Sequence, residues 1–186
     1  MTSTKAQLRT QARKHRAALD PLAEDPQAAC DLFFETIAPT PNQIISAYWP
    51  VKDEFDPTPV LERALKDGIK CALPVIKADS RILEFRLWDE ATKMQSNIFG
   101  IPEPAEGEPC LPDIIISPLL AFDTTGNRLG QGGGYYDATL EHLRAQKEIT
   151  AIGMAFSTQA VLFKLPSEEH DEPLDMVITP KGVHRF

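Results

Sequence analysis

Segments with a helical spacing of apolar side chains alternate with short apolar runs, and prolines or glycines separate them. The apolar runs predict strands at 44–49, 69–76, 82–88, 113–117, 151–156 and 176–179. Helices are predicted at 4–19, at 27–37, from 56 or 58 to about 67, after Tyr136, and near 159–165. The proline-rich segment 89–112 is predicted to be mainly loop. This alternation indicates an α/β fold with a mainly parallel sheet between helix layers.

Length and composition suit one soluble domain that spans residues 1–186. No apolar run approaches the roughly 20 residues that are needed to span a bilayer, so we expect no membrane contact. The N-terminal residues lack the apolar core of a signal peptide, and three widely spaced cysteines suit reduced thiols, so we expect a cytoplasmic protein. The net charge of −8 argues against general nucleic-acid binding. We expect a monomer that binds a small molecule.

The stretch 120–137 reads L-A-F-D-T-T-G-N-R-L-G-Q-G-G-G-Y-Y-D and holds five of the ten glycines. It lies between a strand-like apolar run and a helix-like pattern of Tyr136, Leu140 and Leu143. Because glycine has no Cβ, the backbone N–H groups of such a loop can approach an anion closely. Arg128 and Asp137 flank the glycines, and these side chains can hold phosphate and Mg²⁺. The sequence therefore predicts a phosphate-binding loop in an enzyme or a nucleotide-binding protein.

The loop matches neither of two common phosphate-binding sequences. No G-x-x-x-x-G-K-[ST] occurs, and Tyr135 stands where G-x-G-x-x-G needs its third glycine. A second source of positive charge is the first predicted helix, where one face carries Lys5, Arg9, Arg13 and Arg16. The helical spacing fits both a solvated surface and part of an anion site, and it leaves both interpretations open.

Five motifs follow one another along the chain. They are K-A-Q-L-R at 5–9, Y-W-P-V-K-D-E-F-D at 48–56, F-G-I-P-E-P at 99–104, R-L-G-Q-G-G-G-Y-Y-D at 128–137 and H-D-E-P-L-D-M-V-I-T at 170–179. In this order they resemble the 5-formyltetrahydrofolate cyclo-ligase family, also called methenyltetrahydrofolate synthetases, over nearly the whole chain. The resemblance implies a three-layer α/β sandwich related to ribose-5-phosphate isomerases and coenzyme A transferases. It also implies that ATP and Mg²⁺ drive the conversion of 5-formyltetrahydrofolate to 5,10-methenyltetrahydrofolate through a phosphorylated formyl group.

The resemblance also gives roles to the cations and to the glycine loop. Lys5, Arg9 and Arg128 are expected to bind the ATP phosphates. Lys5 and Arg128 are the expected catalytic cations, because phosphoryl transfer needs positioning and charge neutralisation more than a side-chain nucleophile. The remaining nucleotide-binding residues are expected to be Leu129, Gly130, Gln131, Gly132, Gly133, Gly134, Tyr135 and Tyr136.

Carboxylates are the expected metal ligands. Asp137 is the first candidate for Mg²⁺, Asp171 is the second, and Asp175 fits the acidic pair as well as Asp171 does. The expected substrate-binding residues are Val51, Glu54, Asp56, Gln131 and Tyr135. Asp56 can accept N–H donors of a pterin ring, but it can also cap the helix that follows it. Gln131 stands where family members often carry a tyrosine or a basic residue, and a contact of this side chain with folate or phosphate would change affinity.

Two other functions fit part of the sequence. A non-catalytic nucleotide- or anion-binding module would keep the glycine loop without needing the motif at 48–56. A sugar-phosphate isomerase on the related fold would need an acid–base pair near the loop and no ATP. The second alternative leaves the basic helix and the metal-like aspartates unexplained.

Overall fold

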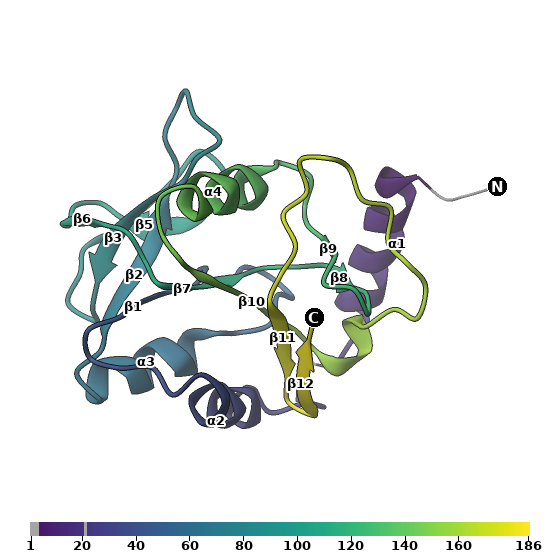
Figure 1. The fold of residues 1–186 in the computed structure, drawn as a ribbon, viewed down its shortest axis with the longest axis horizontal. Helices are drawn as coiled ribbons and strands as arrows, with labels where there is room; N and C mark the ends of the chain where they lie inside the picture. The colour runs from purple at the N-terminus through teal and green to yellow at the C-terminus, as the bar shows by residue number, and fades with distance from the viewer. Residues whose placement is uncertain (1–3, 21) are drawn as a thin grey trace.

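The computed structural model describes residues 4–20 and 22–186, and in this range eight strands form one mixed sheet (Figure 1). The strand order is β12-β11-β10-β7-β1-β2-β3-β6. The strands are β1 Ile44–Ser46, β2 Lys70–Val75, β3 Glu84–Trp88, β6 Pro109–Cys110, β7 Ile114–Ser117, β10 Thr150–Met154, β11 Met176–Thr179 and β12 Gly182–Arg185. Strands β11, β10, β7, β1 and β2 pair in parallel, and the outer pairings are antiparallel. The predicted α/β fold with a mainly parallel sheet is confirmed.

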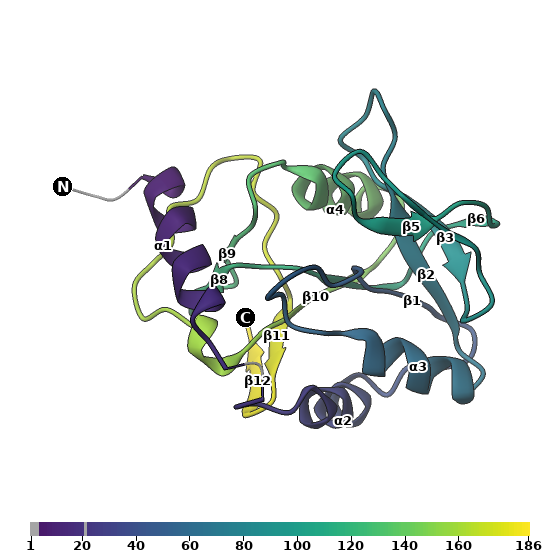
Figure 2. The same cartoon turned by 180° about the vertical axis from the view of Figure 1, so that it is seen from behind.

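Helices cover both faces of this sheet. In both views, α2 (Pro26–Ile37) and α3 (Thr58–Lys66) lie on one face and α4 (Tyr135–Arg144) lies on the other (Figures 1 and 2). Successive side chains of a strand point to opposite faces, so β7 contributes to both cores. Ile114 and Ile116 share a core with α2 and α3, whereas Ile115 packs with α4. This two-sided burial explains why β7 is apolar at three successive positions.

The first helix lies apart from these layers. Helix α1 (Lys5–Ala17) is found at one end of the molecule, beside a short hairpin formed by β8 (Ala121–Phe122) and β9 (Arg128–Leu129) (Figure 1). Leu8 and Ala12 of α1 pack against the small apolar core of that hairpin. This contact places the basic face of α1 near the glycine loop, which begins directly after β9.

The parallel strands bring several loops to one edge of the sheet. Strands β1, β2 and β7 are neighbours with the same direction, so the segments that follow their carboxyl ends meet at a common edge. Ligands of open α/β sheets bind at such an edge. The loop at 47–57, the β2–β3 connection at 76–83 and the glycine loop all contribute residues to one cavity there. The structure thus brings residues of the loops at 50–57 and 123–136 together at this edge.

The predicted helix at 159–165 is wrong. Only a single 3-10 turn, Ser157–Gln159, forms in this region. The chain then becomes extended at Ala160, and the N–H of Val161 donates to the carbonyl of Phe122 in β8. The N–H of Leu165 donates to the buried carboxylate of Asp123. These long-range partners satisfy the backbone groups that a helix would have paired internally.

Short strands account for the other differences from the expected elements. The segment 89–112 contains the hairpin of β4 (Met94–Ser96) and β5 (Pro102–Pro104) as well as the sheet strand β6, and the chain ends in β12 after β11. Strands of two to four residues carry too few positions for a periodic pattern. Within residues 4–20 and 22–186, no helix is long and apolar enough to cross a membrane.

Gly153 in β10 tests how tightly the α4 side of the sheet is packed. A Cβ at this position would lie 2.5 Å from Leu119 Cδ2 and 2.9 Å from both Leu174 Cδ1 and Val177 Cγ2. We expect Gly153→Ala to lower stability by about 1–3 kcal/mol, the usual cost of overpacking a core. Thermal unfolding should show a melting temperature several degrees lower, at roughly 2–4 °C per kcal/mol for a chain of this size. An unchanged melting temperature would contradict the packing described here.

Candidate active site

The cavity at the carboxyl edge of the sheet has a volume of about 800 Å³. One part of its lining is polar and includes Lys5, Arg9 and the glycine loop 130–134. Another part is apolar and includes Trp49 and Phe99. A space of this size and mixed lining suits a ligand that combines anionic groups with an aromatic ring system.

Close approach explains the glycines of the loop. Gly132 has a φ of +106°, and a Cβ on it would lie 3.3 Å from the guanidinium carbon of Arg9. Arg9 Nε donates to the carbonyl oxygen of Gly130 at 3.1 Å. Gly134 is the N-cap of α4 and adopts the left-handed conformation, with a φ of +71°. The loop therefore presents its backbone at the positive end of a helix with an arginine already beside it.

Arg128 and Asp137 pair directly with each other. Arg128 Nη2 donates to Asp137 Oδ1 at 2.7 Å, and Arg128 Nη1 donates to the carbonyl of Glu172 at 2.6 Å. The N–H of Glu172 donates to the same Asp137 oxygen at 3.1 Å. Burial lowers the pKa of Arg128, and the Asp137 carboxylate opposes that shift. Through these hydrogen bonds the pair connects β9, the first turn of α4 and the segment before β11.

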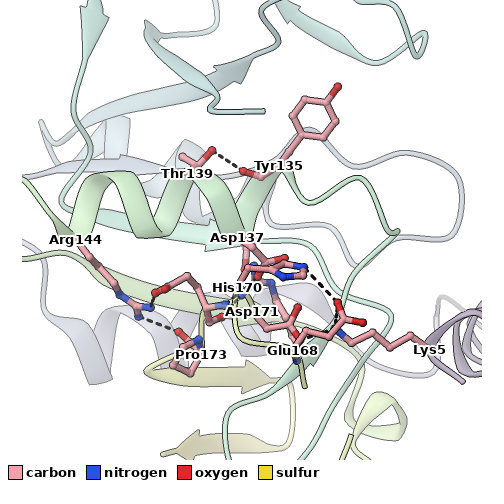
Figure 3. A network of polar contacts seen from close by, with 12 residues as sticks. Lys5, Tyr135, Asp137, Thr139, Arg144, Glu168, His170, Asp171 and Pro173 are labelled. Carbon is pink, nitrogen blue, oxygen red and sulfur yellow. Dashed lines mark hydrogen bonds and ion pairs between the residues drawn. The ribbon is translucent and has the colours of Figure 1, made fainter. Parts of the chain in front are cut away.

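A second cluster of charges surrounds the end of Lys5. Figure 3 shows Lys5 approaching Glu168, His170 and Asp171, which belong to the segment before β11. Lys5 Nζ lies 2.5 Å from Asp171 Oδ2 and 3.1 Å from Glu168 Oε2. One possible ligand atom from each of Glu168, His170 and Asp171 lies within 4.8 Å of the other two, a spacing compatible with a shared metal ion. Burial raises the pKa of Asp171, but hydrogen bonds from Lys5 and from the Glu168 N–H outweigh it and lower the pKa overall.

The structure separates the two candidates for the second metal ligand. Asp171 lines the cavity, whereas Asp175 does not. Asp175 Oδ2 accepts the N–H of Ala151 at 2.7 Å and lies 3.5 Å from Arg144 Nη2. The role of Asp175 as a metal ligand stays a prediction, but its carboxylate links β10, β11 and α4 outside the cavity lining, which favours Asp171. Glu168, which the sequence did not single out as a ligand, belongs to the cluster instead.

Two of the expected substrate-binding residues also lie outside the cavity lining. Asp56 Oδ1 accepts the N–H of Thr58 at 2.9 Å and its hydroxyl at 2.7 Å, so it stabilises the start of α3. The N–H of Val51 donates to Glu54 Oε2 at 3.2 Å. Pro57 is the N-cap of α3, so Asp56 braces the turn before the helix and is not its N-cap residue. Substrate binding by Asp56 and Val51 stays a prediction, although neither residue lines the cavity. The backbone N–H of Val51 helps to orient Glu54, which does line the cavity.

Glu54 is the carboxylate from the 48–56 motif that reaches the cavity. Burial raises its pKa, while the Val51 N–H, Arg16 and the Gln131 amide act in the opposite direction without cancelling the effect. Arg16 Nη1 lies 3.8 Å from Glu54 Oε1, but Arg16 also donates to Asp53 from Nε at 3.2 Å. Glu54 is thus a buried hydrogen-bond acceptor, and the cation beside it, Arg16, also pairs with Asp53.

The raised pKa of Glu54 gives a pH-dependent prediction. A carboxyl whose pKa is higher in the folded state contributes stability that is present below its ordinary pKa and is lost as the pH rises through the raised value. We therefore expect Glu54→Gln to raise the melting temperature relative to wild type more at about pH 7.5 than at about pH 4. The same variant should raise KM for a ligand whose N–H groups donate hydrogen bonds to the Glu54 carboxylate. An equal temperature difference at both pH values would contradict this assignment.

The two tyrosines of the loop face different surroundings. Tyr136 packs against both cores of the sheet, and burial raises the pKa of its phenol. The Tyr135 ring lies 6.0 Å from that of Phe99 in an edge-to-face arrangement and lines the cavity. Figure 3 shows the Tyr135 ring projecting away from Asp137 and His170. Tyr135 is therefore placed for ligand contact, whereas Tyr136 has a structural role as well as a position in the cavity wall.

Gln131 connects the loop to α1. Its amide oxygen accepts a hydrogen bond from Arg13 Nε at 3.0 Å, and its backbone oxygen accepts one from Arg13 Nη2 at 3.0 Å. Leu129, just before the loop, is buried in the hairpin core. Several other cavity residues were not predicted as site residues from the sequence, among them Trp49, Arg81 and Phe99.

Fold and site together define the class of this molecule. It is an α/β protein in which a glycine-rich loop, cations and carboxylates meet in one cavity at the carboxyl edge of the sheet. Residues 1–180 match the sequence model of the 5-formyltetrahydrofolate cyclo-ligase family, and the chain therefore belongs to this family.

Relatives and solved structures agree with that membership. The chain is 33% identical over 181 residues to a 5-formyltetrahydrofolate cyclo-ligase of Haemophilus influenzae, a match that covers 93% of this chain and 96% of the relative. It is 38% identical over 136 residues to the enzyme of that name from Escherichia coli, over 70% and 74% of the two chains. The fold is similar to that of the 5,10-methenyltetrahydrofolate synthetase of Aquifex aeolicus, with a TM-score of 0.80, 29% identity, and coverage of 97% and 92%.

Proposed function

We propose that this chain catalyses the ATP-dependent cyclisation of 5-formyltetrahydrofolate to 5,10-methenyltetrahydrofolate, with release of ADP and phosphate. Membership of the cyclo-ligase family supports the reaction. The observation that carries the proposal is the lining of one cavity of about 800 Å³. The glycine loop, Lys5 and Arg9 line it together with Trp49 and Phe99, so a polyphosphate and a pterin ring can meet there.

The polar end of the cavity suits the phosphates of a nucleotide. Lys5 and Arg9 reach it from α1, and the N–H groups at the start of α4 add the partial positive charge of a helix N-terminus. Arg128 approaches from β9 with its guanidinium held by Asp137. Several cations on different elements can restrain a phosphoryl group and neutralise its charge, which are the main requirements of phosphoryl transfer.

The cluster around Lys5 suits a Mg²⁺ ion. Asp171 and Glu168 offer the oxygen ligands that Mg²⁺ prefers. These carboxylates already hold one cation, the ammonium of Lys5, which Mg²⁺ would displace toward the phosphates. Asp137 receives the hydrogen bonds of Arg128 and Glu172 through Oδ1, so its second oxygen faces fewer constraints. When bound, the metal would neutralise charge on the phosphate oxygens beside these residues.

The chemistry requires a leaving group on the formyl carbon. Transfer of the terminal phosphoryl group forms a bond from phosphorus to the formyl oxygen and breaks the bond to the departing ADP oxygen. N10 then attacks the formyl carbon, the carbon–oxygen bond breaks with loss of phosphate, and the N10 proton leaves. Lys5, Arg9 and Arg128 would hold the phosphate oxygens through both steps. No side-chain nucleophile is needed.

The other end of the cavity suits the folate. The Glu54 carboxylate is a buried acceptor for the N–H donors of a pterin ring, and its partial burial strengthens such a hydrogen bond. Tyr135 and Phe99 form an edge-to-face wall against which an aromatic ring can pack. Gln131 lies between Arg13 and the cavity and is placed to adjust how the folate sits.

An absorbance assay for methenyltetrahydrofolate tests the proposed reaction. We expect product from 5-formyltetrahydrofolate only when ATP and Mg²⁺ are both present. Folded protein that binds ATP but forms no product would overturn the proposal in favour of a non-catalytic binding module. ATP-independent interconversion of sugar phosphates would favour an isomerase instead.

We also propose that the active species is a monomer. The residues of one chain supply the glycine loop, the cations and the carboxylates of the site, so no second copy is needed to complete it. Light scattering during size-exclusion chromatography should give a mass near 20.6 kDa. A dimer of twice that mass with full activity would contradict this part of the proposal.

A further inference from the structure

The glycine loop carries no cation of its own. Its residues 130–134 read G-Q-G-G-G, so any side-chain charge for an anion bound there must come from other elements. Arg9 of α1 provides one such charge at Gly132. A second arginine, Arg81, lies at the other end of the loop beside Gly134, where a Cβ on the glycine would be 3.7 Å from Arg81 Nη1.

Arg81 differs from the other arginines near the site. It belongs to the β2–β3 connection, is exposed, and lines the same cavity as the loop. Arg9, Arg13 and Arg128 each donate hydrogen bonds to protein groups. Among residues 4–20 and 22–186, Arg81 forms no side-chain hydrogen bond and no salt bridge, in contrast to its neighbours on the same connection. Its guanidinium therefore retains all of its donors for a ligand.

The position of Arg81 favours an anion as that ligand. Gly134 is the N-cap of α4, a ten-residue helix, so the partial positive charge of the helix N-terminus lies next to the guanidinium. Two positive groups of this kind repel each other unless an anion lies between them. A tetrahedral phosphate suits both, because backbone N–H groups and the planar arginine fork can bind different oxygens of one group.

We propose that Arg81 is a phosphate-binding residue of this site and contacts the polyphosphate of the nucleotide at the α4 end of the glycine loop. This inference rests on the proposed function. Arg81 and Arg9 would then hold the polyphosphate from two separate elements, the β2–β3 connection and α1. The other anion of the reaction, the glutamate carboxylates of the folate, is the alternative ligand that the experiment separates from phosphate.

Arg81→Ala and Arg81→Lys test the inference, with Lys77→Ala as the matched control. Lys77 lies on the same connection and pairs with Glu84 at 2.8 Å, but it does not line the cavity. We expect Arg81→Ala to raise KM for ATP roughly tenfold or more, the effect of losing a charge-assisted hydrogen bond, with KM for 5-formyltetrahydrofolate within about twofold of wild type. Arg81→Lys should recover part of the loss, because it keeps the charge and loses the fork. Lys77→Ala should match wild type.

Calorimetric binding of a non-hydrolysable ATP analogue separates this inference from the proposed function. Analogue binding that weakens in Arg81→Ala by the same factor as KM for ATP would support it. Equal analogue affinity in wild type and Arg81→Ala would overturn it, as would a rise confined to KM for the folate. Wild-type protein that neither binds the analogue nor forms product would overturn the proposed function itself. Circular dichroism of both Arg81 variants verifies that the fold is intact.

Discussion

Arg128→Ala is expected to lower kcat/KM for ATP by roughly ten- to a hundredfold. The Arg128 side chain is 4% exposed, and the hydrogen bonds of its guanidinium to Asp137 and to the Glu172 carbonyl fix its direction. A hydrogen bond between charged groups contributes about 1.5–3 kcal/mol, which corresponds to that range in rate. The loss should appear in steady-state assays with ATP as the varied substrate.

Controls separate charge loss at the site from general damage. Arg144→Ala removes an arginine that pairs with Glu172 at 2.5 Å outside the cavity lining, and it should leave the kinetics close to wild type. Cys110→Ser should also be neutral, because burial raises the pKa of this thiol to about 11 and keeps it protonated at neutral pH. Wild-type kinetics in Arg128→Ala, or an equal loss in Arg144→Ala, would contradict the assignment of Arg128.

Asp171→Asn is expected to raise the Mg²⁺ concentration for half-maximal rate by at least about tenfold. Its carboxylate lines the cavity with Glu168, and both oxygens of a carboxylate are strong ligands for this hard cation. The amide keeps the shape of the side chain and removes its charge, so the fold should be retained. Titration of activity with Mg²⁺ at saturating ATP measures the effect.

Asp175→Asn provides the matched control for this titration. It lies four residues away on the same segment, but its carboxylate bonds the N–H of Ala151 and faces Arg144. We expect a lower melting temperature and an unchanged Mg²⁺ requirement. If Asp175→Asn shifts the Mg²⁺ requirement and Asp171→Asn does not, the placement of the metal site is wrong.

The local part of the site was predictable from the sequence. A glycine run between a strand and a helix has few structural uses, and four-residue spacing placed Lys5 and Arg9 on one helix face. The structure brings both side chains to the same cavity as the loop. Their roles in phosphate binding remain predictions until they are measured.

The pairing of charges was not predictable in the same way. Asp171 and Asp175 look alike in the sequence, and only the long-range contacts of β10 and α4 remove Asp175 from the cavity. The Arg128–Asp137 bond depends on the path of the loop between them, which no spacing rule gives. Arg81 carries no motif, and its relevance comes solely from the meeting of the β2–β3 connection with the N-terminus of α4.

Oxygen labelling tests the central claim most directly. The substrate is 5-formyltetrahydrofolate that carries ¹⁸O in the formyl group, and the inorganic phosphate released during turnover is analysed by mass spectrometry. If the formyl oxygen accepts the phosphoryl group in this cavity, each phosphate released with the methenyl product carries one ¹⁸O atom. Product formed with unlabelled phosphate, and with the label in water, would contradict the proposed reaction.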